Sequence, residues 1–267
     1  MTTALITGAS SGIGAGFAER FARLGHHLVL VARDEARLNE RAARLRTQEK
    51  VDVEVLVADL STDEGCARVE ARLADRAYPV DVLVNNAGFS LGVDIARSAV
   101  DDEERMLRVL VRAPLRLTKA ALPGMQARDN GTIITVASVA GLISYNSYGA
   151  AKAWAVRFSQ ALSLQFAGTG VKALALCPGL TRTEFHARGN VDASRAPRFL
   201  WLSVERVVDE CLRDLARGKT VSIPSRRYRV LVGIGRLLPT RLTARMARDR
   251  GLLRRRSATD RRPTTDR

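Results

Sequence analysis

The sequence is poor in cysteine. Its three cysteines, Cys66, Cys177 and Cys211, are odd in number and lie far apart among 267 residues. Metal sites usually take closely spaced ligand pairs, and secreted disulfide scaffolds take even sets of cysteines. This sequence has neither pattern. We therefore expect three buried, reduced thiols, with no disulfide framework and no metal site.

Long apolar runs are also lacking. No run approaches the ~20 residues that a membrane-spanning helix needs. Residues 1–8 enter an apolar strand at once, without the basic region, apolar core and cleavage site of a signal peptide. Hydrophobic residues make up 46% and charged residues 27%, which is ordinary for a globular domain. We expect a cytoplasmic protein.

Acidic residues are scarce in one part of the chain. The formal net charge is +15, and residues 224–267 hold +11 of it, from fourteen arginines against three aspartates. The remaining 223 residues are nearly balanced, so the charge does not indicate a fold built for specific nucleic-acid binding. We predict a catalytic domain over 1–223. A basic extension over 224–267 is expected to be partly helical, with a disordered end.

Apolar strand patterns alternate with helical ones along the domain. Helices are expected after residue 12 and over 34–48, 101–127, 147–167 and 204–217. The expected strands span 3–7, 27–32, 51–58, 80–85, 131–137, 171–177 and 220–223. This order predicts an α/β fold: a Rossmann-like, doubly wound parallel sheet of about seven strands with helices on both faces.

A glycine-rich turn follows the first strand. In such a turn, backbone N–H groups at a helix N-terminus can approach a pyrophosphate, which the helix dipole also favours. The spacing is G-x-x-x-G-x-G rather than the commoner G-x-G-x-x-G. It predicts dinucleotide binding by Gly8, Ser10, Ser11, Gly12, Ile13 and Gly14.

Residues after the next strands bear on which dinucleotide binds. Arg33 follows the second strand, where an arginine accommodates the 2′-phosphate of NADP and an acid would favour NAD. We therefore predict NADP(H) in preference to NAD(H), although Arg33 could also be a surface residue that opens a helix. Asp59 and Leu60 follow the third strand, and either bond adenine or brace the sheet edge. Asn86, Ala87 and Gly88 follow the fourth, and either contact the cofactor or form an ordinary turn.

Tyr148 and Lys152 carry the strongest chemical signal. On a helix, residues four apart share a face, so the phenol and the ammonium point the same way. A nearby cation favours phenolate and lowers the pKa of a tyrosine, which can then exchange a proton with a carbonyl oxygen. Ser138 follows the fifth strand and can hydrogen-bond the same oxygen.

Together these motifs resemble the short-chain dehydrogenase/reductase family over about residues 2–223. The resemblance implies that Tyr148 is the acid/base, that Ser138 orients and polarises the carbonyl, and that Lys152 lowers the pKa of the tyrosine and holds the nicotinamide ribose. It also implies that Pro178, Gly179 and Thr183 contact the nicotinamide end.

Two positions depart from the family pattern. Leu110 stands where the family usually has an asparagine that holds a proton-relay water, and leucine cannot support that relay. Another water or polar group must then substitute, or turnover is slow. The interval from Ser138 to Tyr148 is ten residues, where about 12 or 13 is commoner in the family, so the intervening loop is shorter.

The substrate side and the extension are less specific. A lid is predicted over about 184–202, where Phe185, Phe199, Leu200 and Trp201 either line an apolar pocket or pack on the core. Arginines and aliphatic residues interleave over 228–246. This segment either packs on the domain or a neighbouring subunit, or makes peripheral contact with an anionic membrane.

The hypothesis that fits these residues best is an NADP(H)-dependent oxidoreductase. It would move hydride between nicotinamide and a small-molecule carbonyl or secondary alcohol, reducing a hydrophobic or lipid-derived ketone. A homodimer or homotetramer is expected. The alternative, suggested by Leu110 and the basic extension, is a non-catalytic NADP-binding or scaffold protein.

Overall fold

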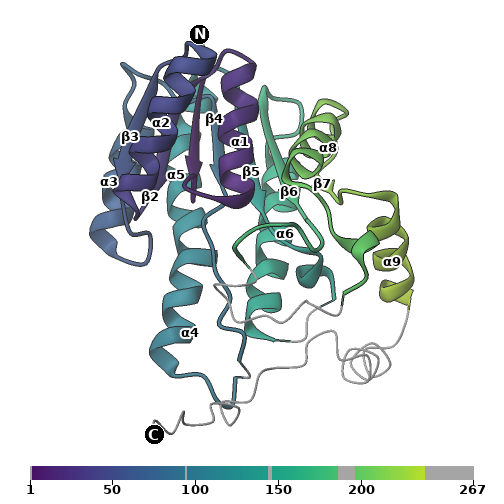
Figure 1. Ribbon diagram of the computed structural model, residues 1–267. Helices are drawn as coiled ribbons and strands as arrows, with labels where there is room; N and C mark the ends of the chain where they lie inside the picture. The colour runs from purple at the N-terminus through teal and green to yellow at the C-terminus, as the bar shows by residue number, and fades with distance from the viewer. Residues whose placement is uncertain (1, 94, 144–145, 186–195, 238–267) are drawn as a thin grey trace, which may run out of the picture.

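The computed structural model describes residues 2–93, 95–143, 146–185 and 196–237. Within them a seven-stranded, fully parallel sheet has the order β3-β2-β1-β4-β5-β6-β7. This confirms the predicted doubly wound sheet (Figure 1). The strands are β1 Thr3–Thr7, β2 His27–Ala32, β3 Val53–Val57, β4 Val82–Asn85, β5 Gly131–Val136, β6 Val171–Leu176 and β7 Val221–Ser222.

Helices connect successive strands and cover both faces of the sheet (Figure 1). In chain order the described helices are α1 Gly12–Arg23, α2 Glu35–Glu49, α3 Asp63–Ala74, α4 Val100–Leu107, α5 Ala113–Ala127, α6 Ser147–Gln165, α8 Val204–Ala216 and α9 Arg226–Leu237. The short turns are the π-helical η1 Arg108–Arg112 and the 3-10 turns η2 Val139–Leu142 and η3 Arg198–Leu200.

Two helical predictions need correction. Helix α3 was not predicted, although the Thr62 hydroxyl caps its start by accepting a hydrogen bond from the Gly65 N–H at 3.0 Å. The single helix expected over 101–127 is divided by the π-helical turn η1. Pro114 lies just after that turn and has no N–H, so the Leu110 carbonyl lacks the usual i+4 donor and the helical pattern changes there.

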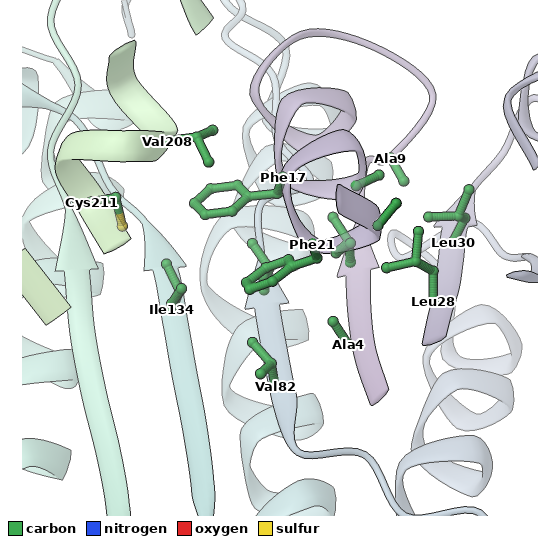
Figure 2. Close-up of a cluster of buried hydrophobic side chains, with 14 of the residues drawn as sticks. Ala4, Ala9, Phe17, Phe21, Leu28, Leu30, Val82, Ile134, Val208 and Cys211 are labelled. Carbon is green, nitrogen blue, oxygen red and sulfur yellow. The ribbon is translucent and has the colours of Figure 1, made fainter. Parts of the chain in front are cut away.

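One face of the sheet is covered by α1, α2 and α8. Phe17 and Phe21 of α1 are stacked, with ring centroids 5.9 Å apart, and belong to a buried cluster with Val208 and Cys211 of α8 (Figure 2). Fully burying one such side chain contributes about 1.5–3 kcal/mol. Alternate strand residues such as Ile6 complete this cluster, as the period of two in a strand requires.

The other face is covered by α3, α5 and α6. The intervening strand residues, such as Leu5 and Leu83, pack there against Cys66 of α3 and Leu117 of α5. The central strands β1, β2 and β4 are therefore buried on both faces, which explains their apolar sequences, whereas the edge strand β3 is partly exposed. All three cysteines are buried and free, as expected.

The strand order places the ligand-binding edge. Strand β1 pairs with β2 on one side and with β4 on the other. The sheet therefore grows from β1 through β2 and β3 in one direction and from β4 to β7 in the other. In open α/β sheets, ligands bind beyond the carboxyl ends of the strands at this switch point. The residues predicted to be functional follow β1, β2, β3, β4, β5 and β6, so they are grouped along that edge.

Candidate active site

The glycine-rich turn joins β1 to α1. Gly8 and Gly12 have φ values of +66° and +57°, a left-handed conformation that favours glycine. A Cβ atom on Gly14 would lie 2.3 Å from the Gly8 carbonyl oxygen, so only glycine allows this close approach. The first turn of α1 holds no acidic residue. The turn therefore has the backbone shape and the dipole that a pyrophosphate needs.

The remaining turn residues differ in what they can offer. Ser10, Ser11 and Gly12 line a hollow together with Arg37 and Arg41 of α2. The Ile13 side chain is partly buried and packs against the core cluster. Contact of these residues with a dinucleotide stays a prediction.

The segment after β4 is tied to the end of β1. Thr7 Oγ1 accepts hydrogen bonds from the N–H groups of Asn86 at 2.9 Å and Ala87 at 3.0 Å. The Asn86 amide nitrogen donates to the Thr7 carbonyl at 2.8 Å. These bonds brace the sheet edge. Contact of Asn86, Ala87 and Gly88 with a cofactor remains a prediction.

Arg33 and Asp59 lie side by side after β2 and β3. Arg33 Nη1 is 3.9 Å from Asp59 Oδ2, and the Arg33 side chain is 62% exposed, so the guanidinium is accessible to an anion. Partial burial tends to raise the pKa of Asp59, but hydrogen bonds from Ser61 and the charge of Arg33 hold it below its ordinary value. The Leu60 side chain is buried in the core, so Leu60 can meet a cofactor only through its backbone.

The three predicted catalytic residues converge after β5. Ser138 follows this strand, and its Oγ accepts a hydrogen bond from the Ala140 N–H at 3.1 Å. The Ser138 hydroxyl is also close enough to that of Tyr148 to oppose the rise of the tyrosine pKa. Lys152 Nζ lies 5.7 Å from the centroid of the Tyr148 ring and donates to the Val136 carbonyl at 2.6 Å. The shorter loop between Ser138 and Tyr148 therefore does not prevent their meeting.

The two ionisable groups are shifted toward their neutral forms. Burial among apolar groups raises the pKa of Tyr148 above its ordinary value, opposed by the Ser138 hydrogen bond. Burial lowers the pKa of Lys152 to about 8. That Lys152 lowers the tyrosine pKa stays a prediction, because in the protein without cofactor, burial raises this pKa and the Lys152 ammonium is bonded to the Val136 carbonyl.

The turn after β6 closes this edge of the sheet. The Pro178 carbonyl accepts a hydrogen bond from the Val139 N–H at 3.0 Å, directly beside Ser138. At the other end of the turn, a Cβ atom on Gly12 would lie 3.2 Å from the Thr183 side chain. Residues 178–183 thus connect the glycine-rich turn with the segment that carries Ser138.

Comparison with known proteins agrees with this geometry. Residues 2–193 match the family model described as short chain dehydrogenase. The chain belongs to this family. A short-chain dehydrogenase from Sphingobium yanoikuyae, solved in complex with NADPH, is 36% identical with a TM-score of 0.80, and the match covers 100% of this chain and 99% of that one.

Two other relatives differ in their described substrates. The NADP-dependent 3-hydroxy acid dehydrogenase YdfG of Salmonella typhi is 37% identical over 188 residues, 68% of this chain and 73% of that protein. The bulky-bulky ketone specific alcohol dehydrogenase from Comamonas testosteroni is 32% identical with a TM-score of 0.76, covering 100% of this chain and 97% of that one. Solved members hold NADPH or NAD. This short-chain dehydrogenase is therefore an oxidoreductase that uses a nicotinamide cofactor.

Leu110, which stands where the family usually has an asparagine, is part of the buried packing of this short-chain dehydrogenase. Leu110 lies in η1 and is buried with Met106 and Ala151. A Cβ atom on Gly88 would lie 2.7 Å from Leu110 Cδ2 and 3.6 Å from Lys152 Nζ. An aliphatic side chain therefore fills the space close to the lysine, and the side chain at 110 offers no hydrogen bond for a proton relay.

Apolar residues surround Tyr148. Phe89, Leu91 and Tyr148 pack around the small cluster that contains Leu110. The Phe185 ring centroid lies 5.9 Å from that of Tyr148. The motif-based search missed Phe89 and Leu91, although they follow directly after the Asn-Asn-Ala-Gly segment.

The predicted lid residues have different surroundings. Leu200 packs on the core, whereas the Phe199 side chain is 58% exposed and lies under the Arg227 guanidinium. Trp201 is half-buried. Residues 186–195 of the predicted lid lie outside the described part of the chain.

Proposed function

We propose that this short-chain dehydrogenase reduces a hydrophobic ketone with NADP(H), or oxidises the corresponding secondary alcohol. The observation that carries this proposal is the hydroxyl pair of Tyr148 and Ser138 at the carboxyl edge of the sheet. The pair lies beside the ring of Phe185 and the apolar Phe89 and Leu91. This arrangement offers a proton and a hydrogen bond to one carbonyl oxygen in an apolar setting.

Each residue has a distinct role in the proposed reaction. The bound cofactor supplies hydride to the carbonyl carbon. Tyr148 gives its hydroxyl proton to the carbonyl oxygen, and Ser138 hydrogen-bonds the same oxygen and holds it in place. Protonated Lys152 stabilises negative charge on Tyr148 until solvent returns the proton. Because Leu110 cannot relay that proton, the return path must use water or backbone groups.

The proposed preference for NADP(H) rests on Arg33, at the carboxyl edge of the sheet. Arg33 presents an exposed guanidinium after β2, where the 2′-phosphate is recognised in folds of this kind. Arg37 and Arg41 of α2 line a hollow with Ser10 and Ser11, where Arg37 is paired with Glu184 and Arg41 with Glu19, so the charge of this hollow is partly balanced. The NADPH complex from Sphingobium yanoikuyae and the NADP-dependent YdfG support the same choice.

The substrate class follows from the lining of the catalytic end. A ketone flanked by apolar groups fits the surroundings set by Phe89, Leu91 and Phe185. The ketone-specific relative from Comamonas testosteroni supports this class more directly than YdfG does. We therefore propose a hydrophobic ketone, with lipid-derived ketones included.

A substrate screen tests this function. Purified protein is incubated with NADPH or NADH and with aliphatic, aromatic and 3-oxoacyl carbonyls, and cofactor oxidation is followed by absorbance. We expect oxidation of NADPH in preference to NADH with at least one bulky ketone. Binding of NADPH without turnover of any carbonyl would instead favour a non-catalytic scaffold.

The surroundings of α9 bear on the remaining predictions. The described helices include none that is long and apolar enough to cross a membrane. Tyr228 and Val232 are buried against the domain, which supports a packing role for this helix. Val230, Leu231 and Ile234 are exposed, so peripheral contact with an anionic membrane and a homodimer or homotetramer stay predictions. Liposome co-sedimentation and light scattering test them.

A further inference from the structure

Tyr228 is a buried tyrosine outside the proposed catalytic set. It lies in the first turn of α9, where it is 7% exposed. Its hydroxyl makes two hydrogen bonds to backbone groups that are far away in sequence. It accepts from the Leu180 N–H at 2.9 Å and donates to the Leu200 carbonyl at 2.9 Å.

These two partners lie at the base of the segment that flanks the catalytic tyrosine. The Leu202 N–H donates to the Leu180 carbonyl at 2.8 Å, and the Arg182 N–H donates to the Leu202 carbonyl at 3.0 Å. Backbone hydrogen bonds therefore already join the segment that contains Leu180 to the segment that contains Leu202, and the Tyr228 hydroxyl adds a side-chain link between them. It lies where the chain leaves the sheet toward Phe185 and where it returns.

The ring of Tyr228 makes a second contact with the same region. A Cβ atom on Gly179 would lie 2.0 Å from Tyr228 Cζ, so the ring fits only against a glycine. Helix α9 also packs against η2, which begins directly after Ser138. The Val139 N–H of η2 donates a hydrogen bond to the Pro178 carbonyl, and Ser138 is the residue before Val139. The packing of α9 on η2 therefore lies next to the proposed catalytic serine.

The neighbouring residue reinforces this arrangement. Arg227 Nη1 donates to the Phe199 carbonyl at 3.1 Å, and its guanidinium lies 5.5 Å from the Phe199 ring centroid. Two consecutive residues of α9 therefore bond to residues of η3. Figure 1 shows that α9 lies at the edge of the molecule, away from α1 and the glycine-rich turn.

A cofactor must pass close to the turn that Tyr228 holds. At one end of residues 178–183, Pro178 is bonded to Val139, the residue after Ser138, and at the other end Thr183 lies against Gly12. A dinucleotide that begins at the glycine-rich turn and reaches Tyr148 must run along this turn. Displacement of the turn would shift the reacting half of the cofactor and leave the adenosine half in place.

We propose that Tyr228 is a positioning residue for hydride transfer. It fixes the turn over 178–183 and the base of the adjoining segment, and so sets the placement of the nicotinamide half and the ketone relative to Tyr148. The proposal rests on the proposed function. Removal of the hydroxyl leaves one buried N–H and one carbonyl without this partner, and small misplacements of reacting groups are costly in rate.

The test is Tyr228→Phe, which keeps the ring on Gly179 and removes the hydroxyl. Tyr78→Phe is the matched control, because Tyr78 is 70% exposed. We expect kcat/KM for the ketone to fall by about 10- to 100-fold. NADPH affinity should fall by roughly threefold or more, and affinity for 2′-phospho-ADP-ribose, which lacks nicotinamide, should stay within about twofold.

Different outcomes separate this proposal from the proposed function. Unchanged kcat/KM and NADPH affinity in Tyr228→Phe would overturn the positioning role. So would an equal loss of affinity for NADPH and for the fragment together with a lower melting temperature, because that result means a role in folding alone. If wild type binds NADPH but reduces no ketone, the proposed function fails, and the contrast between NADPH and the fragment still decides the role of Tyr228.

Discussion

The two ends of the candidate site are held together in different ways. At the glycine-rich end, residues that are neighbours in sequence form the site, because the backbone of Gly8, Gly12 and Gly14 makes the turn between β1 and α1. At the catalytic end, contacts join distant segments. Val139 bonds to Pro178, and Tyr228 bonds to Leu180 and Leu200.

This difference has a consequence for mutation. A change at the glycine-rich end should act mainly on cofactor affinity, because the backbone of Gly8, Gly12 and Gly14 forms that turn, with support from Asn86 and Thr183. A change at the catalytic end can act from a remote helix such as α9, because the turn over 178–183 depends on side chains from elsewhere. Cofactor affinity and turnover should therefore respond to different sets of substitutions.

The largest difference between the effect on turnover and the effect on cofactor affinity is expected for Tyr148→Phe. This change removes the titrating hydroxyl and keeps the ring. Loss of general acid–base catalysis should lower kcat by about 100-fold or more. NADPH affinity, set mainly at the other end, should be nearly unchanged. Steady-state kinetics and fluorescence titration measure the two quantities, and retention of most activity would dismiss the assigned proton donor.

The opposite pattern is expected for Arg33→Asp. Attraction to the 2′-phosphate becomes repulsion, so NADPH affinity should fall by about 10- to 100-fold, while NADH binding changes little or improves. Turnover at saturating cofactor should be kept. Arg157→Asp is the control, since Arg157 is exposed on α6. If wild type binds NADH more tightly than NADPH, the role of Arg33 is wrong.

A smaller effect concerns pH and Lys152, whose folded pKa of about 8 lies below its ordinary value of 10.5 because of burial. Between these values the unfolded chain carries a proton on Lys152 that the folded one has lost, so the contribution of Lys152 to stability should rise with pH above about 8, against the opposite trend of the buried Cys211. Lys152→Met should abolish this rise. Denaturant unfolding of the cofactor-free proteins between about pH 7 and 10 measures it. Equal pH dependence in both proteins would contradict the burial of the ammonium.

The smallest effect is expected at the far C-terminus. Removal of residues 255–267 should leave NADPH binding intact, because the predicted cofactor residues all precede Pro224. Removal from Tyr228 onward should damage substrate affinity or solubility, because it deletes the contacts to Leu180 and Leu200. Loss of NADPH binding in the shorter truncation would show that the extension reaches the cofactor end.

The same comparison explains what could be predicted from the sequence. The sheet and the glycine-rich turn follow from local patterns, and the convergence of Ser138 and Tyr148 follows from the strand order. Helix α3 was missed although Cys66, Val69 and Leu73 share one helical face, so periodicity could have found it.

Other features depend on contacts that local patterns do not encode. Tyr228 meets Leu180 across 48 residues of sequence, and no motif marks that pairing. The upward shift of the Tyr148 pKa is likewise not encoded in the motif, because it comes from burial. Spacing of i and i+4 places Lys152 on the same face, but only the structure shows its ammonium bonded to the Val136 carbonyl. The division of the chain at residue 223 stays a prediction.

Hydride transfer itself gives the most direct test of the central claim. Wild-type protein is incubated with a bulky ketone and with NADPH that carries deuterium at the transferable position of the nicotinamide, and the alcohol is analysed by mass spectrometry. The account predicts one deuterium on the carbinol carbon, in an amount equal to the NADPH consumed. NADPH binding with no labelled alcohol from any carbonyl would contradict it.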